Sequence, residues 1–96
     1  MNNLKKKEEL MEKLRKELPV LRARLAISQE KVAKMIGISR QTYNAMETGK
    51  REMTWSIFLS LLAFFQNNEK TAQMLMQIDE FDEQMKQILS SENPIR

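Results

Sequence analysis

The sequence of 96 residues contains no cysteine and no histidine. A chain without cysteine forms no disulfide, which fits a reducing compartment. Zinc would have to be bound by carboxylates alone, and both the commonest general base and the thiol nucleophile are missing. We therefore expect no enzymatic activity, no metal or other cofactor, and a cytoplasmic location.

Glycine, proline and long apolar runs are also scarce. Two glycines and two prolines interrupt the chain, and β-branched residues are few, so the sequence predicts an all-α fold. No apolar run approaches the roughly 18 residues of a membrane span, and the charged N-terminus does not resemble a signal peptide. We expect a single domain over residues 1–96 that does not associate with membranes.

The net charge of +3 is unevenly distributed. Residues 15–53 hold nine basic and four acidic residues, a net charge of +5, and residues 1–14 add a net charge of +1. Residues 66–96 hold three basic and six acidic residues, a net charge of −3. A basic segment attracts phosphate backbone through counterion release, although a solvated basic surface would look the same in sequence.

Hydrophobic periodicity predicts helices over about 3–16, 18–26, 29–36, 40–47, 55–65 and 69–89. Pro19 leaves open whether the first two are separate helices or one kinked helix, because proline lacks the N–H that a helix interior requires. The apolar face of the first consists of Leu4, Met11 and Leu14, and that of the second of Leu18, Leu21 and Leu25.

Helix ends in the middle of the chain are well marked. Ser28, Ser39 and Thr54 each precede a predicted helix and are favourable N-cap residues. Gly37 and Gly49 follow helices at positions where left-handed backbone angles are common. Residues 29–36 and 40–47 are therefore two short helices joined by a turn of three residues.

Two helices that cross over such a short turn need a small residue at their contact and apolar residues beneath it. Ala33 fits the contact. The apolar positions are Val32, Ile36, Ile38, Tyr43 and Met46. The outward residues of the second helix are polar and not acidic: Arg40, Gln41, Thr42 and Asn44. These features are those of a helix-turn-helix, which places its second helix in the major groove of DNA.

Residues 18–65 resemble the Cro/C1-type helix-turn-helix family, which includes phage repressors, xenobiotic-response-element-like regulators and several antitoxins. The features that match are Ser28-Gln29, Ala33, Gly37, Ser39-Arg40-Gln41-Thr42 and Glu47-x-Gly49-Lys50-Arg51. Met53 stands where many members have proline. The resemblance implies a lambda-repressor-like helical bundle, with residues 1–17 and 66–96 as N-terminal and C-terminal helices outside it.

The resemblance also implies roles for individual residues. Gln29 would contact a backbone phosphate, and Arg40 and Gln41 would read base edges. Ser39 would cap its helix and can also contact the DNA. Thr42 and Asn44 would contact a phosphate or a thymine methyl, with Ala45 nearby. The remaining implied roles are phosphate contacts by Lys50 and Arg51, and an ion pair between Glu47 and Arg22 that braces the fold.

These roles predict a sequence-specific transcriptional regulator, expected to be a repressor, whose partner is double-stranded DNA. An apolar stripe along 69–89 suggests a homodimer interface or a site for a protein partner. Its members, spaced by four and three, are Met74, Ile78, Phe81, Met85 and Ile88. Two alternatives remain open: an antitoxin that also binds a toxin, and an interaction module that kept the fold without binding DNA.

Overall fold

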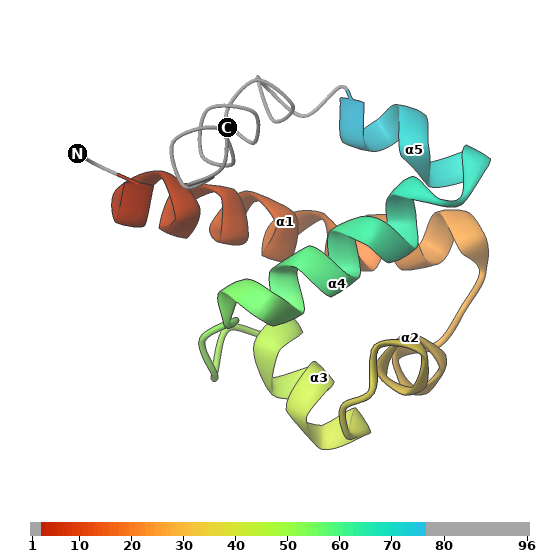
Figure 1. Cartoon of the computed structure of the whole chain (residues 1–96). Helices are drawn as coiled ribbons and strands as arrows, with labels where there is room; N and C mark the ends of the chain where they lie inside the picture. The colour runs from red at the N-terminus through yellow and green to blue at the C-terminus, as the bar shows by residue number, and fades with distance from the viewer. Residues whose placement is uncertain (1–2, 77–96) are drawn as a thin grey trace.

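The structure, a computed structural model, describes residues 3–76 and contains five α-helices and no strand in that range. The helices are α1 (Asn3–Leu25), α2 (Gln29–Ile36), α3 (Arg40–Glu47), α4 (Trp55–Gln66) and α5 (Glu69–Met76). Helix α4 crosses α1, and α5 packs back on both of them. The pair α2 and α3 lies below α4 in the view of Figure 1. This arrangement confirms the all-α, lambda-repressor-like bundle with helical additions.

The first two predicted helices are one continuous helix. Pro19 lies inside α1 and is exposed. Its ring removes the hydrogen bond to the carbonyl of Arg15, which disfavours an uninterrupted helix. The helix nevertheless continues, because one apolar face is buried on both sides of the proline: Leu14 and Leu18 before it and Leu21 after it are all 0 % exposed.

The prediction of which residues form the apolar face in the N-terminal half of α1 was partly wrong. Leu4 is 71 % exposed, Met11 is half-buried, and Leu10 is fully buried. Leu10 begins the stripe that continues through Leu14, and Leu4 lies roughly 120° away from it around the helix axis. The core joins this stripe to residues of the other four helices: Val32, Ala33, Tyr43, Met46, Phe58, Leu61, Leu62, Phe65 and Leu75.

The three expected N-caps are confirmed. The side-chain oxygens of Ser28, Ser39 and Thr54 accept hydrogen bonds from backbone N–H groups in the first turns of α2, α3 and α4, at 3.0, 3.0 and 3.2 Å. Each cap supplies a partner to an N–H that a helix leaves unpaired at its start. The short helices α2 and α3, of eight residues each, therefore begin at defined points.

The two glycines act as predicted. Gly37 has φ of 83° and Gly49 has φ of 84°. At Gly37 the next N–H, that of Ile38, bonds to the carbonyl of Ala33 at 3.0 Å, and at Gly49 that of Lys50 bonds to the carbonyl of Ala45 at 2.8 Å. Both are Schellman endings, in which a left-handed residue turns the chain back over the last helical turn.

The last predicted helix is described only as far as Met76. Its start is fixed by Thr71, which is buried and donates a hydrogen bond to the carbonyl of Phe65 at 2.6 Å. Met74 is half-buried against the core. The rest of the expected stripe, from Ile78 onward, lies outside the described residues. No helix within residues 3–76 is long and apolar enough to cross a membrane.

Candidate nucleic-acid interface

The scaffold of the α2–α3 pair has the expected composition. Ala33 is 1 % exposed, and the Val32, Tyr43 and Met46 side chains are fully buried. Tyr43 is therefore a core residue and not a surface aromatic that could stack on bases. The hydrogen bond from Asn44 to Gln29, in the first turn of α2, places the start of α2 beside the outer face of α3.

The outer face of α3 is polar and open to solvent. Arg40, Gln41 and Asn44 are exposed, whereas Thr42 is half-buried. Arg40 and Gln41 make no hydrogen bond or ion pair with other residues of the described range, so their donors and acceptors are available to a ligand. Neither side chain has to break an internal contact before it binds.

Ser39 is first of all a helix cap. Its hydroxyl accepts from the N–H of Thr42 at 3.0 Å and donates to the Thr42 hydroxyl oxygen at 2.9 Å. The hydrogen of Ser39 is thereby used, while the hydroxyl hydrogen of Thr42 has no partner among residues 3–76. Of the two, Thr42 retains the group that can donate to DNA.

Gln29 is held by two side chains of α3. Its Nε2 donates to Oε1 of Glu47 at 2.8 Å, and its Oε1 accepts from Nδ2 of Asn44 at 3.0 Å. No pattern in the sequence predicted this link, because Gln29 is 15 and 18 residues away from its two partners and only the fold brings them together. It places Gln29 and Asn44 side by side at the α2–α3 surface.

The expected pair between Arg22 and Glu47 is confirmed. Arg22 donates from Nε and Nη2 to the two carboxylate oxygens of Glu47 at 3.1–3.3 Å. The Glu47 side chain is 4 % exposed and that of Arg22 is 20 % exposed. Arg22 also donates to the carbonyl of Ile27, and Arg15 donates to the carbonyl of Glu47, both at 3.3 Å. A buried carboxylate requires such partners, since desolvation of an unpaired charge is very costly.

The hydroxyl of Tyr43 is buried without a hydrogen-bond partner among the described residues. Burial, reinforced by the nearby Glu47 carboxylate, raises the pKa of Tyr43 well above its usual range, although Arg22 opposes the shift. The tyrosine therefore stays neutral at physiological pH and serves as a packing residue.

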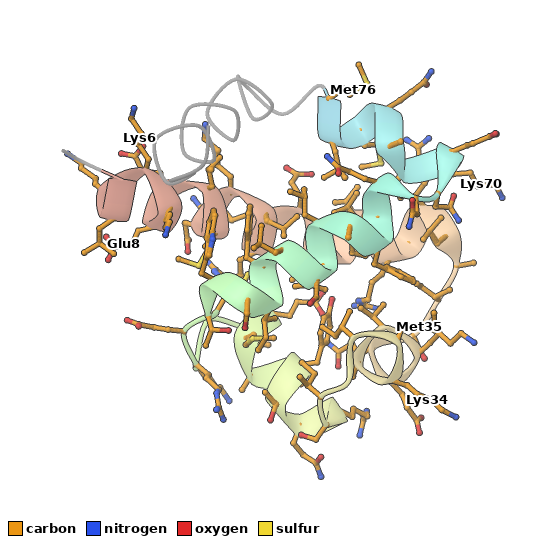
Figure 2. The ribbon with its side chains drawn as sticks, in the orientation of Figure 1. Lys6, Glu8, Lys34, Met35, Lys70 and Met76 are labelled. Carbon is orange, nitrogen blue, oxygen red and sulfur yellow. The ribbon has the colours of Figure 1, made fainter. Side chains whose placement is uncertain are left out.

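Two basic residues follow the end of α3. The backbone N–H groups of Lys50 and Arg51 both bond to the carbonyl of Ala45, at 2.8 and 3.1 Å, and both side chains are exposed. The backbone of the loop is thus folded back on the end of α3, and the Arg51 side chain also lines the groove beside α1. On α2, Lys34 and Met35 point outward, away from α4 (Figure 2).

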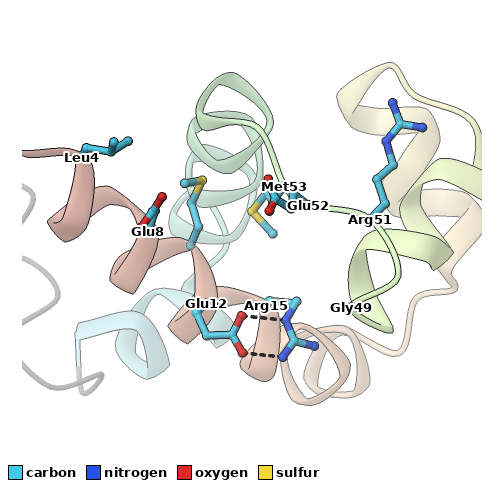
Figure 3. A pocket seen from close by; sticks show the side chains of 9 residues that line it. Leu4, Glu8, Glu12, Arg15, Gly49, Arg51, Glu52 and Met53 are labelled. Atoms are coloured by element: carbon cyan, nitrogen blue, oxygen red, sulfur yellow. Dashed lines mark hydrogen bonds and ion pairs between the residues drawn. The ribbon is translucent and has the colours of Figure 1, made fainter.

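An open groove of about 510 Å³ lies between the N-terminal half of α1 and the loop after α3. Figure 3 shows its side chains, including the ion pair of Glu12 with Arg15 close to Gly49. The groove mixes carboxylates with guanidinium groups, and its lining includes Leu4, Met11 and Met53. Within residues 3–76 no group of three acidic side chains is arranged to hold a metal ion.

Comparison with known proteins identifies the segment that carries this surface. Residues 21–66 match the helix-turn-helix family model, whereas no curated protein and no solved structure matches the chain. The match begins within α1 and contains all of α2, α3 and α4. Residues 21–66, just under half of the chain, are therefore a segment of the Cro/C1 type, the helix-turn-helix found in DNA-binding regulators.

Proposed function

We propose that the chain is a sequence-specific transcriptional regulator that reads the major groove of DNA with α3. The observation that carries this proposal is the free polar face at the start of α3, formed by Arg40 and Gln41 on a helix-turn-helix scaffold. The N-terminal residues of a recognition helix are those that reach base edges in the major groove.

The two exposed side chains suit base recognition. Arginine pairs bidentately with O6 and N7 of guanine, and glutamine pairs with N6 and N7 of adenine. Arg40 and Gln41 have no competing partner among the described residues, so both can make such pairs. Thr42 retains a donor, and Ala45 is half-buried next to the groove-facing residues, where its methyl group suits a thymine methyl.

Phosphate contacts would fix the register of α3 on the duplex. Gln29 in the first turn of α2 lies beside Asn44 of α3, and Lys50 and Arg51 follow α3 with exposed side chains. Positive charge supports this role, since residues 15–53 carry a net charge of +5. The contacts contributed by Lys50 and Arg51 release counterions and strengthen binding to any sequence.

We further propose a homodimer that acts as a repressor at a palindromic site, with half-sites about 34 Å apart. The interface expected along the last helix lies mostly outside the described residues, and Met74, within them, packs on the core. The interaction-module alternative rests on that same C-terminal segment, and the identity of the neighbouring coding sequence would test the antitoxin alternative.

Salt dependence of binding to random duplex DNA tests the proposal. We expect affinity to fall roughly ten- to fortyfold per bound chain between 50 and 200 mM salt, as two or three charged phosphate contacts require. Lys50→Ala should reduce the slope of log affinity against log salt by about one. The control is Lys70→Ala, which removes an exposed lysine from α5, away from α2 and α3 (Figure 2). Binding that is absent, or independent of salt, would contradict the proposed function.

A further inference from the structure

A chain of hydrogen bonds connects the buried ion pair of the fold to the outer face of α3. It starts at the guanidinium of Arg22, passes through the carboxylate of Glu47 and the amide of Gln29, and ends at the amide of Asn44. Asn44 is exposed, whereas Glu47 is 7 % exposed. The charge inside the fold is therefore linked to a side chain on the DNA-facing surface.

The carboxylate fixes the direction of every bond in this chain. An ionised carboxylate only accepts hydrogen bonds, so the group that Gln29 presents to Glu47 must be its NH₂, at 2.8 Å. The carbonyl oxygen of Gln29 then points to Asn44, and only the NH₂ of Asn44 can satisfy it, at 3.0 Å. A flip of either amide would place two oxygens or two NH₂ groups against each other.

The fixed direction decides what each amide can offer to DNA. The oxygen of Gln29 is already engaged, which leaves it one free N–H and suits it to a phosphate oxygen. Asn44 keeps one free N–H and its Oδ1, which has no partner among the described residues. One donor next to one acceptor is the complement of the N7 and N6 edge of adenine. Guanine presents two acceptors at that edge, and its O6 would face the oxygen of Asn44.

We infer that Asn44 is a specificity-determining residue that selects adenine over guanine, and that Glu47 and Gln29 are positioning residues that fix the direction of its amide. The inference rests on the proposed function, because it assumes that α3 enters the major groove. It adds a base reader to Arg40 and Gln41, and it gives the buried carboxylate a role in recognition as well as in stability.

The inference is tested first by selecting bound sites from a random pool of duplex DNA. Affinity is then measured for the selected site and for the same site with guanine in place of adenine at one position. The full chain should select a site with a required adenine. Asn44→Ala should lower the adenine-to-guanine affinity ratio at that position roughly 5- to 100-fold. Arg40→Ala should lower discrimination at a different position and leave this ratio unchanged.

Two variants test the positioning residues. Gln29→Ala leaves the ion pair of Arg22 and Glu47 intact, and Glu47→Gln replaces the carboxylate by a group that can accept or donate. Both should lower the adenine-to-guanine ratio although Asn44 is present. A purely structural role would weaken binding to the two sites equally. If Glu47→Gln does not fold, Gln29→Ala makes the same test on a folded protein.

Three results would contradict the account, and they can be told apart. Equal weakening of the two sites by Asn44→Ala would show a phosphate contact and overturn the inference. If Gln29→Ala, or folded Glu47→Gln, keeps the adenine-to-guanine affinity ratio of the wild type, the positioning role is overturned. A wild-type chain that selects no sequence would overturn the proposed function itself, whereas altered selection by Arg40→Ala alone would leave that function standing.

Discussion

At the scale of single residues, three helices are followed by a residue in the left-handed conformation, which is glycine at two of them and alanine at the third. Gly37 and Gly49 have φ of 83° and 84°, and Ala26, after α1, has φ of 56°. Ala26 closes α1 with the same bonds as the glycines, since the N–H of Ile27 bonds to the carbonyl of Arg22 at 3.1 Å. The left-handed conformation costs about 1–2 kcal/mol in any residue with a Cβ, so of these three helix ends it is Ala26 that carries the strain.

Exchange of alanine and glycine at these ends should change stability in opposite directions. We expect Ala26→Gly to raise the free energy of unfolding by about 0.5–1 kcal/mol, because relief of strain exceeds the added entropy of the unfolded chain. Gly37→Ala should lower it by about 1 kcal/mol through the backbone alone, since a Cβ there meets no atom within 4 Å. Urea denaturation measures both changes. Loss of stability in Ala26→Gly would show that the residue is not strained.

Tyr43, the only tyrosine in the chain, makes stability depend on alkaline pH. In the unfolded chain it loses its proton near pH 10, whereas burial raises the pKa of the folded state above that value. The stabilising contribution is therefore complete below about pH 10 and decreases as the pH rises further. Tyr43→Phe should remove this part of the pH dependence.

The same variant tests the unpaired hydroxyl. At pH 7 we expect Tyr43→Phe to be at least as stable as the wild type, and up to about 1 kcal/mol more stable, because no hydrogen bond is lost. Urea denaturation at pH 7 and at pH 10.5 measures both effects. A clear loss of stability at pH 7 would mean that the hydroxyl has a partner in solution.

At the scale of elements, α1 extends beyond the segment that the family model matches. The match begins at residue 21, yet Leu10, Leu14 and Leu18 are fully buried. Nearer the N-terminus, the Nζ atom of Lys7 lies over the ring of Trp55, 5.0 Å from its centroid. The rings of Trp55 and Phe58 are stacked, with centroids 4.7 Å apart. We propose on this basis that the N-terminal extension is part of the same folding unit as the helix-turn-helix.

Leucines in the extension offer a matched test of that proposal. Leu10→Ala should lower the free energy of unfolding by about 2–5 kcal/mol, because it leaves a cavity in the core. Leu4→Ala, the same change on the same helix at a residue that is 71 % exposed, should have an effect below about 0.5 kcal/mol. Thermal or urea unfolding of both variants decides the matter. Similar small effects would show that the extension is separate from the core.

The sequence predicted local features well and tertiary ones poorly. The starts of α2, α3 and α4 followed from Ser28, Ser39 and Thr54, and the ends of α2 and α3 followed from the two glycines, because all five residues act on neighbouring backbone groups. The continuity of α1 through Pro19 did not follow, because it depends on burial against other helices. The link between Gln29 and Asn44 was missed for the same reason, whereas the pair of Arg22 with Glu47 was inferred from the family and not from spacing.

At the scale of the whole molecule, the charges and the fold support one orientation on DNA. The α2–α3 face combines the free side chains of Arg40 and Gln41 with the flanking cations Lys50 and Arg51. The groove between the N-terminal half of α1 and the loop after α3 is lined by three carboxylates, of Glu8, Glu12 and Glu52, and by two guanidinium groups, of Arg15 and Arg51. Its net charge is −1, and Arg15 is paired with Glu12, so it attracts phosphate less than the α2–α3 face does. We therefore expect the duplex to lie against α3 and the start of α2, with the N-terminal half of α1 away from it.

The most direct test of this account compares a base-reading variant with a phosphate-contact variant on two kinds of DNA. On the selected site, Arg40→Ala and Gln41→Ala should each cost about 1–3 kcal/mol of binding free energy, with a much smaller loss on random duplex. Lys50→Ala should weaken both complexes by about the same factor. If Arg40→Ala and Gln41→Ala leave affinity for the selected site unchanged, α3 is not the helix that reads the sequence.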